Sequence, residues 1–169
     1  WLLGDKAQSA HSLRAAAAAR GVDPTRLVFA PRMGPSRHLA RHRLADLFLD
    51  TGPYNAHTTA SDALWAGLPV LTCAGQTFAS RVGASLLTAC DLPQLVTQDL
   101  DSYFQRALAL SGDTNELTRL RQHLNDRRLQ LRLFDTRRFT RHIERAYDMA
   151  WERFARGLPP EHLVVPPID

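Results

Sequence analysis

Residues 50–70 read DTGPYNAHTTASDALWAGLPV, and this stretch decides the predicted fold. It begins where the mostly apolar run Leu47–Asp50, typical of a buried strand, ends. After a loop that contains glycine and proline, residues 58–66 predict a short helix, which Gly67 ends. The next apolar run, Val70–Cys73, predicts another strand. A strand, a helix and a strand in this order predict a βαβ unit with two parallel strands.

The first turn of the predicted helix carries polar side chains that suit a phosphate. His57, Thr58 and Thr59 fall where the helix begins, and Asp62 lies one turn further in, where it would reach a ribose hydroxyl. The first turn of a helix has N–H groups without intrahelical partners and about half a unit of positive charge. Threonine hydroxyls and an imidazole N–H add donors at the same place. The alternative interpretation is an ordinary strand–helix unit with a polar cap.

Composition favours a globular protein of ordinary size. The chain has 169 residues, of which 44% are hydrophobic and 22% are charged. No apolar run approaches the roughly 20 residues that span a bilayer, so we expect no membrane partner. The net charge is +4, carried mainly by arginine, since Lys6 is the only lysine. Because the arginines of the late helices alternate with acidic residues, we expect a solvated helical surface and no nucleic-acid partner.

Two features bear on the cellular setting and on the extent of the chain. Cys73 and Cys90 lack CxxC spacing and follow apolar residues, which predicts reduced thiols and a cytoplasmic protein. The opening residues, Trp1 to Leu3, read as the end of a buried strand whose beginning is missing. We therefore expect the chain to be part of a longer polypeptide.

Strands and helices continue to alternate on either side of the βαβ unit, which predicts an α/β fold. We expect a Rossmann-like parallel sheet with helices on both faces, followed by C-terminal helices. Further strands are predicted at 27–30 and 95–96, and further helices at 8–20, 35–43 and 78–88. From Asp99 onward the chain turns helical. We expect three parts: a Rossmann-like lobe over 1–135, a helix over 136–157, and an extended tail over 158–169.

A second group of candidate residues follows another predicted strand. In parallel sheets, ligands bind outside the carboxyl ends of the strands. Met33 to Arg41 follow the strand at 27–30, as His57 follows the strand at 47–50, so both segments are predicted to line one crevice. His38 and Arg41 are three residues apart on one helix face, where an imidazole and a guanidinium can hold a flat base. A basic surface helix is the alternative.

The sequence gives little support for a metal site, a glycine-rich nucleotide-binding loop or a catalytic serine. Asp99 and Asp101 match the DxD pattern of some metal-dependent sugar enzymes, but they open an amphipathic helix, where aspartate is favoured as a cap. No other His, Cys or carboxylate cluster has ligand spacing, so we predict no metal. Glycine-rich nucleotide fingerprints are absent, and Ser80 and Ser85 lack the setting of a catalytic serine.

Four stretches together resemble one family. They are LADLFLDT at 44–51, NAHTT at 55–59 with Asp62, LWAGLP at 64–69 and TFASRV at 77–82. This combination is similar to the C-terminal catalytic lobe of the O-GlcNAc transferases and their bacterial homologues, and the likeness runs from about Trp1 through the helix that contains Trp151. The resemblance implies a GT-B fold of two Rossmann-like lobes, in which the C-terminal lobe binds UDP-GlcNAc.

The resemblance also implies roles for single residues. His57, Thr58 and Thr59 would hold the diphosphate, and Asp62 the ribose. His38 would stack on the uracil with Arg41 beside it, Met33 would meet the base through its backbone, and Tyr54 would line the pocket. A lysine that contacts the nucleotide in the family is replaced here by Pro35. A second family lysine, which binds the diphosphate, would lie before Trp1, as would the other catalytic lobe and the TPR repeats that recruit protein acceptors.

The activity that follows from the resemblance is inverting transfer of N-acetylglucosamine from UDP-GlcNAc to Ser or Thr hydroxyls of proteins, without a metal cofactor. Donors at the helix start would stabilise the charge that grows on the departing UDP. We expect the 169 residues alone to be inactive. Two alternatives stay open: another GT-B enzyme, either a different UDP-hexose transferase or a UDP-GlcNAc epimerase, and an arginine-rich anion- or nucleic-acid-binding module.

Overall fold

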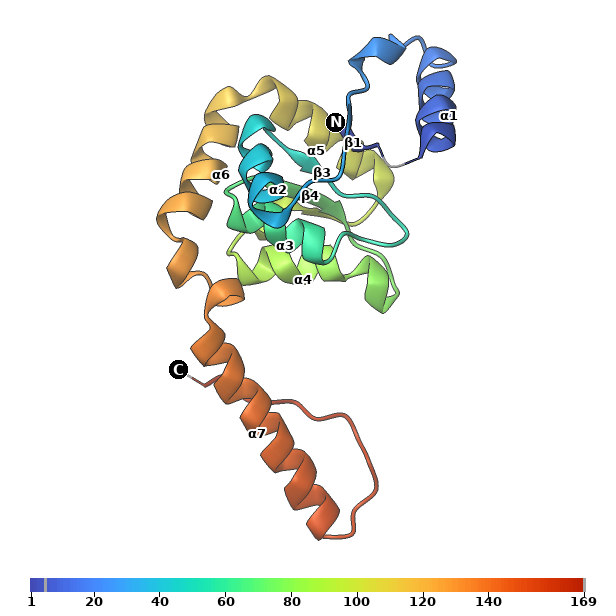
Figure 1. Cartoon of the computed structure of the whole chain (residues 1–169). Coiled ribbons are helices and arrows are strands. Elements are labelled where there is room, and N and C mark those ends of the chain that lie inside the picture. Colours follow the sequence, from blue (N-terminus) through green and yellow to red (C-terminus); the bar gives the residue numbers. More distant parts are fainter. Residues whose placement is uncertain (5, 169) are drawn as a thin grey trace. The chain divides into compact units, whose positions relative to one another are not determined.

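A computed structural model of the chain describes residues 1–4 and 6–168 (Figure 1). Contacts divide the chain into two compact units, Trp1–His42 and Arg43–Asp169. Asp169, the last residue of the predicted tail, lies outside the described residues.

The first unit contains a short parallel pair of strands. Strand β1 (Leu2–Leu3) pairs with β2 (Phe29–Ala30), so that Leu2 lies opposite Phe29. Helix α1 (Ala7–Ala18) connects them, and α2 (Pro35–Arg41) follows β2. These elements confirm the predicted strand–helix–strand–helix order, although both strands are shorter than their apolar runs. Leu2 and Leu3, which the sequence places in a buried strand, are exposed.

The second unit contains a three-stranded parallel sheet in the order β3-β4-β5. The strands are β3 (Phe48–Leu49), β4 (Val70–Cys73) and β5 (Val96–Thr97). Helices α3 (Thr58–Trp65) and α4 (Val82–Ala89) lie on one side of the sheet, and α5 (Leu100–Gly112) lies on the other (Figure 1). The parallel sheet with helices on both faces confirms the predicted fold class.

The core of the second unit is built from side chains of these layers. Leu64 of α3, Leu71 of β4 and Leu87 of α4 are fully buried, and Leu110 of α5 and Leu124 of α6 (Thr114–Asp126) join them from the other helices. Burying each such side chain contributes about 1.5–3 kcal/mol relative to its exposure. The three-stranded sheet and α3, the helix of this unit that carries candidate residues, are thus held in place by a continuous apolar cluster.

Caps set the helix boundaries. The carboxylate of Asp99 accepts a hydrogen bond from the Ser102 N–H at 2.7 Å, which confirms that the DxD sequence caps α5. Gly67 ends α3 with a φ of +82°, a conformation that favours glycine. The predicted helix 78–88 is divided into a 3₁₀ turn, Phe78–Ser80, and α4. The division arises because Thr77 and Ser80 form a capping box around the turn.

Helix α7 (Thr136–Ala155) extends away from the α/β layers of the second unit (Figure 1). None of its residues is buried, and its apolar stripe is exposed to different degrees: Phe139, Ile143, Tyr147, Trp151 and Phe154. Residues 158–168 have no regular secondary structure. They fold back along α7, since Arg153 bonds Glu161 and the Ile168 N–H donates to His142 Nε2.

The remaining 3₁₀ turns are Pro24–Arg26, His42–Leu44, Pro93–Leu95, Arg128–Gln130 and Arg132–Phe134.

Both cysteines are free thiols, as predicted; Cys90 is buried and Cys73 is partly exposed. Burial raises the pKa of the Cys90 thiol to about 12. Among the described residues, no helix is both long and apolar enough to cross a bilayer. The cytoplasmic setting stays a prediction.

Candidate functional site

The first turn of α3 offers donors that the helix itself does not use. His57 is the N-cap, and its carbonyl accepts from the Ser61 N–H at 3.0 Å. Ser61 is the first residue of α3 whose N–H has a partner one turn back. The N–H groups of Thr58, Thr59 and Ala60 therefore have no such partner. Thr58 and Thr59 are exposed, and their hydroxyls make no hydrogen bond to the described residues. The turn thus offers the exposed hydroxyls of Thr58 and Thr59, together with unpaired backbone N–H groups, at the carboxyl end of β3, and Ala60 within it is buried.

The His57 ring is held between aromatic neighbours. Tyr54 stacks on it with ring centroids 4.7 Å apart and an interplanar angle of 21°, and Phe78 meets it edge-on. Its Nε2 lies 3.4 Å from the Ala79 carbonyl, which is a long contact. Tyr54 itself is 66% exposed. The stack orients the imidazole beside the first turn of α3, and it gives Tyr54 a contact that the sequence did not predict.

Asp62 lies one turn into α3 and is partly buried. It shares this short helix with Thr58 and Thr59, and His57 and Tyr54 come from the loop that leads into it. The structure thus brings five of the eight predicted site residues onto one loop–helix segment of the second unit.

The other predicted residues lie in the first unit, around α2. Arg41 Nη2 is 2.8 Å from His38 Nδ1, and Arg41 Nη1 donates to the Pro31 carbonyl at 2.8 Å. Because a guanidinium can only donate, Nδ1 of His38 accepts and carries no proton, which places the proton of the neutral ring on Nε2. The His38 ring also meets the buried His42 ring edge-on. Arg41 therefore orients His38, a role that its helical spacing alone did not specify.

Met33 and Pro35 belong to the connection between β2 and α2. Met33 is 39% exposed, and Gly34 and Pro35 occupy the N-cap and first position of α2. Proline suits that position because its fixed φ is helical and it lacks an N–H that would stay unpaired. Pro35 supplies no side-chain donor at the position where the family described above usually has a lysine. The two groups of candidate residues lie in separate units, so their common crevice stays a prediction.

Asp50 and Tyr103 contribute contacts that sequence reasoning missed. The buried Asp50 carboxylate accepts hydrogen bonds from the N–H groups of Thr51 and Ala56 and from Thr72 Oγ1. Tyr103 Oη, from α5, donates to the Asp50 carbonyl at 2.7 Å. An aspartate that directly follows an apolar strand is the one sequence signal that would have pointed here; the strand itself, predicted as buried, is half exposed at Leu49. Burial, and then the charge of Asp50, raise the pKa of Tyr103 to about 12.

The Tyr103 hydroxyl should make the protein lose stability at alkaline pH. Its ordinary pKa is 10.0 and its folded value is about 12, so the folded state keeps a proton that the unfolded chain releases. The stabilisation is fully present below pH 10 and is lost as the pH rises toward 12. We expect the stability advantage of the wild type over Tyr103→Phe, measured by urea unfolding, to shrink across that range. An advantage that stays constant with pH would contradict this.

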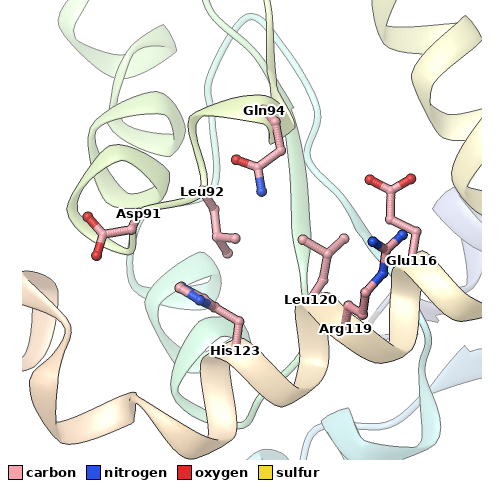
Figure 2. A pocket seen from close by; sticks show the side chains of 7 residues that line it. All are labelled: Asp91, Leu92, Gln94, Glu116, Arg119, Leu120 and His123. Atoms are coloured by element: carbon pink, nitrogen blue, oxygen red, sulfur yellow. The ribbon is translucent and has the colours of Figure 1, made fainter.

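A pocket of about 240 Å³ lies elsewhere in the second unit (Figure 2). It is lined by residues of α6 and of the segment between α4 and β5: Asp91, Leu92, Gln94, Glu116, Arg119, Leu120 and His123. The segment after α4 precedes β5, so this pocket is at the amino ends of the strands, whereas His57 follows a carboxyl end. None of the predicted site residues lines it.

No group of three or more His, Cys, Asp or Glu side chains within residues 1–4 and 6–168 is placed to hold a metal ion. Metal independence stays a prediction.

The comparisons with known proteins identify the family. The model of glycosyl transferase family 41 matches residues 1–143. The chain belongs to glycosyl transferase family 41. This family 41 chain is 37% identical over 166 residues to a probable UDP-N-acetylglucosamine–peptide N-acetylglucosaminyltransferase of Arabidopsis thaliana, and 34% identical over 163 residues to the enzyme of that name from Caenorhabditis elegans.

A solved structure of a similar protein has the same fold as this family 41 chain. A mutant O-GlcNAc transferase from Thermobaculum terrenum superimposes with a TM-score of 0.81 and 36% sequence identity, covering 86% of this chain and 28% of that one. The two curated matches cover 98% and 96% of this chain but only 17% and 14% of the relatives. The likeness confirms the predicted membership and the GT-B lobe, and it concerns one part of much longer proteins.

Proposed function

We propose that this chain is the UDP-sugar-binding lobe of an inverting glycosyltransferase that moves N-acetylglucosamine from UDP-GlcNAc to Ser or Thr hydroxyls of proteins. The observation that carries the proposal is the group of unpaired donors at the start of α3, at the carboxyl end of a parallel strand in a family 41 chain. His57, Thr58 and Thr59 bind the diphosphate in this proposal, and Asp62 binds the ribose.

The chemistry suits these groups. The acceptor hydroxyl attacks the anomeric carbon, the bond from that carbon to the diphosphate oxygen breaks, and the electron pair leaves with UDP. Preorganised N–H groups, hydroxyls and an imidazole stabilise the charge that develops on the leaving diphosphate. In the first unit, the neutral His38 ring, oriented by Arg41, offers a flat face for the uracil, and Met33 meets the base through its backbone. Tyr54, of the second unit, lines the nucleotide site.

The partners follow from the same proposal. Residues 1–135 form the nucleotide lobe, and residues 136–157 pack against it or reach toward a second catalytic lobe of the same protein. Protein acceptors are recruited by TPR repeats in another part of the polypeptide. We also propose that the protein acts in the cytoplasm and needs no metal.

The nucleotide preference tests the proposal. The native protein that carries these residues should bind UDP in preference to ADP and CDP by calorimetric titration. His57→Ala should weaken UDP binding about tenfold to a hundredfold, because a hydrogen bond to a charged group is worth about 1.5–3 kcal/mol. The matched control is His162→Ala, which removes an exposed histidine of the tail.

Equal affinity for all three nucleotides, together with a steep loss of binding in salt, would indicate a general anion-binding module instead. Mass analysis of a protein acceptor incubated with different UDP-hexoses identifies the donor. Interconversion of free UDP-GlcNAc without a modified acceptor would indicate an epimerase.

A further inference from the structure

Asp50 is a buried charge at the carboxyl end of β3, with only 4% of its surface exposed. Its Oδ1 accepts from the N–H groups of Thr51 at 2.9 Å and Ala56 at 2.7 Å. Its Oδ2 accepts from Thr72 Oγ1 of β4 at 2.6 Å. A buried carboxylate is costly without partners, and these three donors compensate for the burial.

These hydrogen bonds fix the two ends of the loop that leads into α3. Thr51 begins the loop, and Ala56 directly precedes His57, the N-cap of α3. A single carboxylate oxygen therefore sets the distance between the strand end and the helix start. The adjacent N–H of Asn55 donates to the Ala79 carbonyl at 2.9 Å, so two successive amides before His57 are anchored.

The backbone of Asp50 is also held, by a strand and a helix of the second unit. The Asp50 N–H donates to the Leu71 carbonyl of β4, and the Asp50 carbonyl accepts from Tyr103 Oη of α5. From α4, Gly83 approaches so closely that a Cβ there would lie 2.7 Å from Asp50 Oδ2. Asp50 has little freedom to move, and it transmits that rigidity to the loop.

We propose that Asp50 is a positioning residue of the nucleotide site: its carboxylate holds the Ala56 N–H and thereby aims the first turn of α3 at the diphosphate. The inference rests on the function proposed above and adds a residue to it. Asp50 acts as a hydrogen-bond acceptor through the backbone and not as a catalytic base, since its oxygens already accept three hydrogen bonds. Small displacements of preorganised groups are costly for ligands that need them in place.

The test compares UDP affinity in three variants of the native protein. Asp50→Ala removes the acceptor and should weaken UDP binding about tenfold or more. Asp50→Asn should restore most of the affinity, because an amide oxygen can accept from Thr51 and Ala56 while the amide nitrogen donates to Thr72 Oγ1. Thr97→Val is the matched control, since Thr97 Oγ1 donates to the Thr72 carbonyl at 3.1 Å and does not touch Asp50.

The outcomes separate the two proposals. A wild-type protein without preference for UDP overturns the proposed function and this inference with it. A wild type that prefers UDP, with Asp50→Ala binding as well as Thr97→Val, overturns the inference alone. So does Asp50→Asn binding as weakly as Asp50→Ala, because the negative charge would then matter more than the acceptor geometry.

Amide hydrogen exchange tests the inference even if Asp50→Ala does not fold. In the wild type, the Ala56 amide should exchange more slowly than that of Tyr54, which lies in the same loop and has no hydrogen-bonded N–H among the described residues. The difference should persist in Asp50→Asn. Equal exchange of the two amides in the wild type would overturn the role of Asp50.

Discussion

Gly83→Ala should lower the free energy of unfolding by about 2 to 4 kcal/mol, because overpacking and a disturbed buried hydrogen bond act together. A Cβ at this position would lie 2.6 Å from Thr72 Oγ1 and 2.7 Å from Asp50 Oδ2. These two atoms are hydrogen-bonded to each other and buried, so neither can move aside without losing its partner. The better helix propensity of alanine, about 1 kcal/mol, offsets only part of the loss.

Gly112→Ala is the matched control for this substitution. Gly112 is the last residue of α5, and a Cβ there meets nothing within 4 Å. Urea unfolding should give Gly112→Ala a stability equal to or slightly above that of the wild type. If both glycine variants were equally stable, the close packing of α4 against Asp50 and Thr72 would be wrong.

The double variant Thr58→Val, Thr59→Val should lose most of the affinity for UDP. Two hydrogen bonds to a charged group are worth about 3 to 6 kcal/mol together, which corresponds to roughly a hundredfold to ten-thousandfold. Valine keeps the shape and β-branching of threonine and leaves the backbone N–H groups in place, so the change isolates the hydroxyls. Both side chains are exposed, and stability should therefore stay close to that of the wild type.

Thr88→Val provides the comparison for the double variant. Thr88 lies on α4, is exposed, and its hydroxyl donates only to the Ala84 carbonyl one turn back. Calorimetric titration with UDP should give this variant the affinity of the wild type. Unaltered UDP binding by the double variant would show that the two hydroxyls do not bind the diphosphate. The backbone N–H groups of α3 would then have to account for binding.

The position of α7 is a part of the structure that the sequence predicted only locally. The helix predicted over 136–157 is confirmed; Asp135 caps it, and Phe139, Ile143 and Trp151 lie on its apolar stripe. Amphipathic spacing states that a face will be covered, but not by which element. In the described residues that face stays at least partly exposed, so the prediction that residues 136–157 pack on the lobe or reach a second lobe remains a proposal.

The sequence by itself determined the order of strands and helices, the helix start at Asp99, the helix that begins at residue 136, and the polar first turn of α3. These features depend on neighbours within a few residues: apolar runs, capping side chains and the N–H groups that every helix start leaves unpaired. The family pattern depends on the same local stretches. This is why the candidate residues from Tyr54 to Asp62 were found without coordinates.

Only the tertiary structure decided what holds those residues in place. Asp50 is hydrogen-bonded to Thr72 and Tyr103, which are 22 and 53 residues away in the chain. Gly83 packs closely against Asp50 and Thr72. Such contacts leave no periodicity in the sequence, because they form only when β3, β4, α4 and α5 pack together. The stacking of Tyr54 on His57, and the orientation of His38 by Arg41, likewise depend on side-chain geometry that spacing alone does not specify.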